Sequence, residues 1–374
     1  MSTDQVFFSS DDNSSEVRAK LRHLPACSML LLFLYGVFAF VHFWNSADLA
    51  EHRRERPSVS DIVQGREALA VEAVYKDVFP IRDFSTGLLN AISFGIFDEA
   101  RGGLIKGSDG WLFTDEEFSW DLKSAGAIER HLKLAADATA KLRQSGIEPI
   151  LLLLPEKADV YRDKLGHVEP PASRQHYYAD IRRRLLEIGG VEIPDLQQAF
   201  VRARKGGAVF MQSDTHWTVE GAGIAAHLVA DVLIKDARLR HQDFAIKRES
   251  PISHMGDLYK FAKFSAFAPL FPQPGDPLVQ LTAVPAEVSL DVLFEEETAP
   301  EVAIVGSSYS ANPKWSFEAQ LRAYARADVV NFAEEGKGPF APMESFLQSK
   351  LSEQKQLKYV VWEMPLRYFD ETKY

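Results

Sequence analysis

Hydrophobic and polar positions along most of the chain follow the alternating helix and strand pattern of an α/β protein. Residues 128–144 repeat apolar side chains at helical spacing, and Gly146 ends that pattern before the continuous apolar run 149–154. Such a run is typical of a strand buried on both faces of a parallel sheet. We expect further helices over residues 173–188, 219–234, 319–326 and 343–354, and further strands over residues 191–194, 302–305, 329–332 and 359–362. This alternation predicts a three-layer α/β/α sandwich around a mostly parallel sheet.

The amino-terminal part of the chain follows a different pattern. Residues 1–23 are polar and rich in Ser and Asp, which predicts a disordered cytoplasmic tail. Residues 24–44 contain no Asp, Glu, Lys or Arg, and a run of about 20 apolar residues can cross a bilayer as a helix. We therefore expect one transmembrane anchor over residues 24–45. A cleaved signal peptide is the alternative, because Ser46 and Ala47 are small enough for a cleavage site.

Basic residues flank the apolar run on both sides: Arg18, Lys20 and Arg22 before it, and Arg53, Arg54 and Arg56 after it. The first group lies nearer to the run, which favours a cytoplasmic amino terminus. Residues 46–100 are predicted to be a helical connector, and residues 101–374 the α/β domain. Within that domain Asp109-Gly110 predicts a hairpin. Residues 242–300, rich in Pro and Phe, predict loops and irregular hairpins.

Composition excludes several classes of function. The net charge of -11 argues against nucleic acid as a partner, because binding to phosphates requires a basic surface. Cys27 is the only cysteine, so the chain forms no intrachain disulfide. The histidines are scattered without the spacing of a metal site. We therefore expect neither a metal nor a cofactor.

Asp214 and His216 are the first candidate catalytic pair. Residues two apart in an extended chain point the same way, so the carboxylate can orient the imidazole. A histidine held in this way is a common general base for a weak nucleophile. Thr218 is a candidate N-cap for the helix 219–234, which places His216 ahead of a helix amino terminus that favours a neutral imidazole. The alternative is an ordinary surface turn that leads into a helix.

Ser308 is the candidate nucleophile. The strand 302–305 leads directly into Gly306-Ser307-Ser308, and such a strand-to-turn junction presents a hydroxyl at the carboxyl edge of a sheet. An ordinary turn is the alternative. Ser307 and Ser310 are rival nucleophiles at this stage.

Two motifs together resemble a known family. The stretch Ser213-Asp214-Thr215-His216-Trp217-Thr218, followed by a Gly/Ala-rich apolar run, and the later stretch Val305-Gly306-Ser307-Ser308-Tyr309-Ser310 resemble the SGNH-type domain of the alginate O-acetyltransferases. The resemblance is to the membrane-anchored branch close to the alginate proteins J and X. It implies that Asp214 orients His216, that His216 is the base and that Ser308 is the nucleophile. Ser307 stands where many members of the family carry Asp.

The resemblance also suggests residues around the triad. Ser307, Tyr309, Trp217 and Lys157 are candidate oxyanion or substrate residues, and the Ser308 amide with a nearby loop amide is the expected oxyanion pair. The family places the loop Pro155-Glu156-Lys157 near the rim of the active site, yet in this chain we expect Lys157 to be a solvated loop charge. Trp217 is expected to pack in the interior rather than stack on a sugar. Met255-Gly256-Asp257-Leu258 resembles a family segment without an assigned chemical role.

The function we expect is transfer of an acetyl group, through an acetyl-serine intermediate, to hydroxyls of an exported polysaccharide. The resemblance implies a membrane-bound O-acyltransferase as the source of acetyl groups, and a catalytic domain held in the periplasm at the inner membrane. An SGNH-type acetylesterase is one alternative, because the same triad serves both reactions. A non-catalytic glycan-binding subunit is another. Alginate, acetylated cellulose and other exopolysaccharides are all candidate acceptors.

Overall fold

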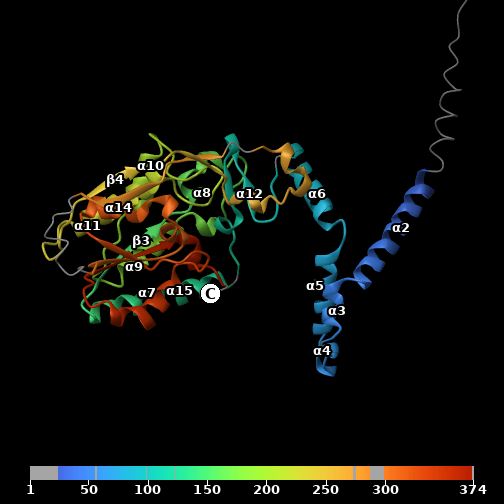
Figure 1. The fold of residues 1–374 in the computed structure, drawn as a ribbon, viewed down its shortest axis with the longest axis horizontal. Helices are drawn as coiled ribbons and strands as arrows, with labels where there is room; N and C mark the ends of the chain where they lie inside the picture. Colours follow the sequence, from blue (N-terminus) through green and yellow to red (C-terminus); the bar gives the residue numbers. More distant parts are fainter. Residues whose placement is uncertain are drawn as a thin grey trace, which may run out of the picture. The chain divides into compact units, whose positions relative to one another are not determined.

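The computed structural model describes residues 24–54, 57–97, 99–121, 123–272, 275–286 and 299–372 (Figure 1). The predicted tail, residues 1–23, lies outside this part of the chain. Between Leu89 and Asn90 the chain divides into two compact units.

The first unit is helical. It contains α2 (Leu24–Trp44), α3 (Ala47–His52), α4 (Val59–Val63) and α5 (Arg66–Val78). Aromatic contacts join α2 to the α5 region: the ring centroids of Phe43 and Tyr75 are 5.2 Å apart, and those of Tyr35 and Phe79 are 5.9 Å apart. The side chains of α2 are described from Ser28 onward. Over the residues that the structure describes, no helix combines the length and the apolar character needed to span a membrane.

The second unit begins within α6 (Arg82–Ile96). Ala91 and Phe94 of this helix are buried in a small core together with residues of α12 (Leu258–Phe261) and of the loop that follows it. The Asn90 side chain donates a hydrogen bond to the Ala262 carbonyl (2.9 Å). The carboxyl-terminal half of α6 is therefore part of this unit.

A hairpin follows α6, as Asp109-Gly110 predicted. It pairs β1 (Leu104–Lys106) with β2 (Leu112–Thr114) in antiparallel register. Asp109 has φ 54° and Gly110 has φ 78°. Asp and Gly are among the residues that adopt positive φ most readily, which is why this dipeptide favours the tight turn.

A parallel sheet of four strands in the order β3-β10-β8-β9 forms the centre of the second unit. Its strands are β3 (Glu148–Leu154), β8 (Val302–Val305), β9 (Val329–Asn331) and β10 (Tyr359–Pro365). The expected strand over residues 191–194 is reduced to one parallel bridge between Glu192 and Ile150. The Leu151 amide donates to the Glu192 carbonyl (2.9 Å), so this segment still covers the edge of β3.

Successive residues of the strands face opposite helical layers, which confirms the predicted sandwich. In β3, Ile150 and Leu152 belong to a core shared with α10, α11 and α14, whereas Leu151 and Leu153 belong to a core shared with α7, α9 and α15. Figure 1 shows β3 between α10, α11 and α14 on one side and α7 and α15 on the other. The helices of the two layers are α7 (Ser124–Gln144), α9 (Tyr177–Leu186), α10 (Leu196–Ala203), α11 (Val219–Leu233), α14 (Phe317–Ala325) and α15 (Phe340–Ser345).

The segment after α11 is more regular than the sequence indicated. Antiparallel pairs form between β4 (Phe244–Arg248) and β7 (Leu281–Pro285), and between β5 (Ile252–His254) and β6 (Asp276–Leu278). We expected loops and irregular hairpins because of the many prolines. Pro277 and Pro285 instead lie within these two-stranded pairs, where a proline removes few ladder hydrogen bonds.

The alternation of the sheet gives a test of the fold. Leu151→Ala removes a fully buried side chain of β3 and should lower the free energy of unfolding of this unit by about 2–5 kcal/mol. Leu186→Ala at the end of α9, where the side chain is 42% exposed, should lower it by less than about 1 kcal/mol. Chemical denaturation of both variants measures this difference, and equal losses would contradict the assignment of Leu151 to the core.

Candidate active site

Asp214 and His216 lie on a short loop closed by antiparallel contacts. Phe210 forms a bridge with Trp217, and the Met211 amide donates to the His216 carbonyl (3.1 Å). Thr218 then caps α11 by accepting a hydrogen bond from the Gly221 amide (3.1 Å), as predicted. The loop and the helix that follows it therefore fix the backbone on both sides of His216.

Ser308 reaches this loop from the end of β8. Its Oγ lies 2.8 Å from His216 Nε2, and His216 Nδ1 lies 2.6 Å from Asp214 Oδ1. Because Nδ1 donates its proton to the carboxylate, Nε2 has a free lone pair and accepts from the serine hydroxyl. The structure thus joins the three residues in one chain of hydrogen bonds, which is an arrangement that can activate a serine as a nucleophile.

Asp214 uses both of its carboxylate oxygens. Oδ1 also accepts from the His216 amide (2.9 Å), while Oδ2 accepts from His254 Nε2 (2.9 Å) and from the Asp257 amide (3.0 Å). Burial disfavours the charged form, but the hydrogen bonds from His216 and His254 outweigh it and hold the pKa of Asp214 well below its usual range. Asp214 is therefore an ionised partner for His216.

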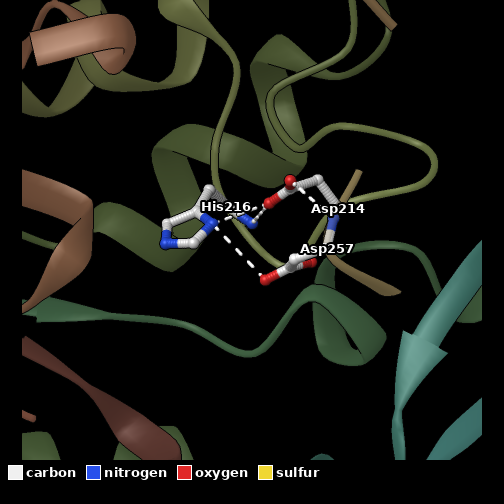
Figure 2. Close-up of side chains that lie close together, drawn as sticks. All are labelled: Asp214, His216 and Asp257. Carbon is white, nitrogen blue, oxygen red and sulfur yellow. Dashed lines mark hydrogen bonds and ion pairs between the residues drawn. The ribbon is translucent and has the colours of Figure 1, made fainter. Parts of the chain in front are cut away.

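Asp257, the residue directly before α12, lies near the same histidine. Figure 2 shows its carboxylate and that of Asp214 on the Nδ1 side of the His216 ring, with the Asp257 oxygen 3.8 Å from Nδ1. Asp257 binds the loop itself, since it accepts from the amide (2.8 Å) and the hydroxyl (2.6 Å) of Thr215. The ligand atoms of Asp214, His216 and Asp257 lie within 4.8 Å of one another, as in a metal site. However, Nδ1 and these carboxylates are already engaged in hydrogen bonds, so the geometry fits carboxylates that orient the imidazole better than a cation site.

Other ionisable side chains bind the remaining backbone groups of the loop. Asp276 of β6 accepts from the Gln212 amide (3.0 Å) and from the Ser213 amide and hydroxyl (3.0 and 2.6 Å). Tyr309 donates from its hydroxyl to the Thr215 carbonyl (2.5 Å). These contacts satisfy polar backbone groups that would otherwise be buried without partners.

Lys157 is buried, and our expectation of a solvated loop charge was wrong. Its side chain is 1% exposed, and Nζ donates to the carbonyls of Leu112 (2.7 Å), Asp214 (2.9 Å) and Gln212 (3.1 Å). Burial lowers the pKa of Lys157 to about 8, although Glu117 opposes this shift. Three carbonyls match the three donors of an ammonium group, so Lys157 supports the loop and does not point at the reacting atoms.

The turn that carries Ser308 is held by Glu363 of β10. The Ser307 amide donates to Glu363 Oε2 (2.8 Å), the Ser307 hydroxyl lies 3.0 Å from both carboxylate oxygens, and the Ser310 hydroxyl donates to Oε2 (3.1 Å). The two rival hydroxyls thus face Glu363, while the Ser308 hydroxyl faces His216. Burial raises the pKa of Glu363 to about 7, against the hydrogen bonds from Ser307 and Ser310. Geometry therefore selects Ser308 as the nucleophile candidate.

Aromatic rings enclose the imidazole. Trp315 is stacked on His216 with ring centroids 4.8 Å apart and donates from Nε1 to the Ser308 carbonyl (3.1 Å). Tyr309 lies 4.7 Å from His216. Trp217 is fully buried against Tyr309 and Phe317, in agreement with its expected packing in the interior. It therefore has no face available for a sugar and is not a substrate residue. Tyr309 is also buried and supports the loop through Thr215.

Several residues of the site were given no role from sequence: His254, Asp257, Asp276, Trp315 and Glu363. Of these, only Asp257 lies in a stretch that the sequence singled out, Met255-Gly256-Asp257-Leu258. Each of them acts through contacts between distant segments, so no local spacing points to it. Gly256 offered the one local signal, because a Cβ there would lie 1.9 Å from the Ser213 carbonyl oxygen. That close approach requires glycine and brings His254 and Asp257 against the loop.

Comparison with known proteins gives consistent results. The family model described as an SGNH hydrolase-like domain, acetyltransferase AlgX, matches residues 104–366. A probable alginate O-acetylase AlgJ from Pseudomonas aeruginosa is 36% identical over 320 residues, which cover 82% of this chain and 81% of that protein. A probable alginate O-acetylase AlgJ from Azotobacter vinelandii is 34% identical over 82% of this chain and 80% of its own length. The solved O-acetyltransferase domain of Pseudomonas putida AlgJ aligns with a TM-score of 0.66 at 33% identity and covers 72% of this chain and 93% of that domain.

The raised pKa of Glu363 predicts how stability depends on pH. The unfolded carboxyl loses its proton near 4.5, whereas the folded one keeps it until about 7. Over this interval the native state binds more protons, so stability falls as pH rises. Relative to Glu363→Gln, which cannot titrate, the wild type should lose up to about 3 kcal/mol of unfolding free energy between pH 4.5 and 7.

Urea denaturation at several pH values measures this difference, and Glu301→Gln is the matched control. Burial opposes ionisation of Glu301, but hydrogen bonds from the Arg240 amide and Lys358 lower its pKa. Its contribution should therefore have the opposite sign and be lost as pH falls through the pKa of the folded state. A difference between wild type and Glu363→Gln that stays constant with pH would contradict the shift.

Proposed function

Because the chain belongs to the family of SGNH hydrolase-like acetyltransferases, we propose that it is an O-acetyltransferase that acetylates an alginate-like polysaccharide through an acetyl-Ser308 intermediate. The observation that supports this mechanism most directly is the 2.8 Å contact between Ser308 Oγ and His216 Nε2. The complete chain of hydrogen bonds to Asp214 also favours an enzyme over a non-catalytic glycan-binding subunit.

In the first half of the reaction, Ser308 Oγ attacks the acetyl carbonyl while His216 Nε2 takes the hydroxyl proton. The bond between the acetyl group and the donor breaks, and the imidazolium returns that proton to the leaving group. In the second half, His216 takes a proton from a sugar hydroxyl, whose oxygen attacks the acetyl ester. Ser308 Oγ then leaves and regains a proton from His216. Asp214 stabilises the imidazolium in both halves.

The negative charge on the tetrahedral intermediate requires hydrogen-bond donors. Ser308 occupies the first position of α13 (Ser308–Ala311), and a backbone amide at that position has no acceptor within its own helix. The Ser308 amide is therefore our proposed first oxyanion donor, with a second amide from a neighbouring loop. Loss of one such donor costs about 3 to 4 kcal/mol of barrier stabilisation in related chemistry.

The acceptor is proposed from relatives whose names include alginate O-acetylase. We propose a membrane-bound O-acyltransferase as the donor, and a periplasmic catalytic domain anchored in the inner membrane by residues 24–44. The support for the anchor is the absence of Asp, Glu, Lys and Arg from that run of the sequence. Donation beside a membrane is physically reasonable, because water competes with the polysaccharide for the acyl-enzyme.

Ser308→Ala should abolish the acetyl adduct and reduce transfer by about 10³-fold or more, because the nucleophile is lost. The full-length protein is incubated with 4-nitrophenyl acetate and deacetylated alginate oligosaccharides, and peptide mass spectrometry locates the adduct. Ser307→Ala and Ser310→Ala remove the rival hydroxyls and should leave the adduct on Ser308. Rapid release of acetate without acetylated oligosaccharide would favour an esterase, and an adduct on another serine would refute the assignment.

The proposed anchor is tested by membrane extraction. The full-length protein should stay in the membrane pellet after alkaline carbonate, and its mature mass should include residues 24–44. Leu32→Arg with Val37→Arg should release it, because each arginine costs about 2.5–3.5 kcal/mol at the centre of a membrane helix. A mature chain that begins near Ser46 would support the signal peptide instead, and extraction of the wild type by carbonate would exclude the anchor.

A further inference from the structure

Glu363 is a buried carboxylate to which the proposed reaction assigns no role. Its side chain is 0% exposed and its partners all belong to the turn that carries the nucleophile. The Ser307 amide and hydroxyl and the Ser310 hydroxyl are donors, which is the bonding pattern of an ionised acceptor. A buried carboxylate costs stability in an apolar core, so its retention at this position points to a task at the site.

The backbone of the turn lies so close to Glu363 at Gly306 that a side chain there would not fit. A Cβ at Gly306 would lie 2.6 Å from Glu363 Oε2 and 2.9 Å from Glu363 Cβ. The sequence Gly306-Ser307-Ser308 therefore follows β8 with its backbone in contact with the neighbouring strand β10. Hydrogen bonds on both sides of Ser308, at Ser307 and at Ser310, fix the residue between them. By holding the turn at these two residues, Glu363 sets the direction of the Ser308 hydroxyl.

Glu363 also acts on His216 through its charge. The two groups meet at Ser308: Glu363 binds Ser307 and Ser310 on either side of it, and the Ser308 hydroxyl lies 2.8 Å from His216 Nε2. A positive charge on His216 therefore favours ionisation of the Glu363 carboxyl and lowers its pKa. The interaction is mutual, so an ionised Glu363 stabilises the imidazolium that forms during acyl transfer. Other ionisable groups near this pair include Asp214 and Asp257 on the Nδ1 side of the ring, and His254, which is bonded to Asp214. Tyr309 lies against the His216 ring, and Arg367 contacts the Tyr309 hydroxyl at 3.3 Å.

We propose that Glu363 is a positioning residue for acyl transfer: it aims the Ser308 hydroxyl at His216 and stabilises the protonated imidazole from the side opposite Asp214. This inference rests on the proposed function. When His216 takes the proton from Ser308, its positive charge lies between two carboxylates, Asp214 on Nδ1 and Glu363 behind the nucleophile turn. When His216 returns the proton, that stabilisation is released.

The test compares Glu363→Gln, Glu363→Asp and the control Glu301→Gln in the full-length protein. The rate of acetyl-enzyme formation from 4-nitrophenyl acetate is measured from pH 5 to 9. Glu363→Gln keeps the shape of the side chain but removes its charge, so acylation should slow by about 10-fold or more and the acidic limb of the pH profile should move to lower pH by about 0.5 unit. Glu363→Asp keeps the charge, but its shorter side chain moves the carboxylate away from the turn. This variant should therefore acylate more slowly, while the acidic limb of its pH profile should stay at the wild-type pH.

Glu301 directly precedes β8, at the end of that strand opposite Gly306, and pairs there with Lys358 (2.7 Å). Glu301→Gln should therefore leave both the rate and the pH profile at their wild-type values.

A folded Glu363→Gln with the wild-type rate, or with a slower rate but an unmoved acidic limb, would overturn the proposal. If Glu363→Gln does not fold, Glu363→Asp decides: a wild-type rate, or an acidic limb displaced from its wild-type position, overturns the proposal. Failure of the wild type to form an acetyl-serine adduct would refute the proposed function itself, and the two failures are therefore distinguishable.

Discussion

The site depends on one physical constraint, which is that the loop of residues 212–216 must be buried without leaving its backbone unsatisfied. Carboxylates accept hydrogen bonds from its amides. Asp276 binds the amides of Gln212 and Ser213, Asp257 binds the amide of Thr215, and Asp214 binds the amide of His216. Lys157 binds the Gln212 and Asp214 carbonyls, and Tyr309 binds that of Thr215. An unpaired buried amide or carbonyl costs about 1–3 kcal/mol, so these ionisable groups fix the conformation in which His216 faces Ser308.

The site has two halves, the loop that carries His216 and the turn that carries Ser308, and the carboxylates that hold them have pKa values shifted in opposite directions. Asp214, on the loop, is kept ionised by the donors around it, and the hydrogen bonds it accepts outweigh its burial. Glu363, beneath the serine turn, has a pKa raised by burial to about 7 despite its three donors. The charge of Asp214 is thus fixed over the neutral range, whereas the carboxyl beneath the serine turn is sensitive to pH. The support of the nucleophile turn by Glu363 therefore depends on pH near neutrality.

The sequence allowed most of the sheet, the helical layers and the three residues of the hydrogen-bonded chain to be predicted for specific reasons. Continuous apolar runs identify strands buried on both faces, and the spacing of Asp214 and His216 survives in any extended loop. The roles of the supporting residues could not be predicted, because Asp257 and Asp276 meet the loop only after β5 and β6 pair. Lys157 was misjudged because a lysine after a strand is usually solvated, and only the three carbonyls that converge on it make its burial possible. Glu363 directly follows the predicted strand 359–362 and was not recognised as part of β10.

The bonding of Asp214 limits what the triad can do with a proton. A carboxylate offers about four lone-pair sites, and Asp214 accepts from the His216 amide and Nδ1 on one oxygen and from His254 and the Asp257 amide on the other. No site is left for an added proton, and protonation would break one of these hydrogen bonds. In the proposed mechanism the proton from Ser308 therefore stays on His216, and Asp214 contributes orientation and charge. His254 has a clear physical role in this arrangement, because its donated hydrogen bond keeps the second oxygen occupied and the carboxylate ionised.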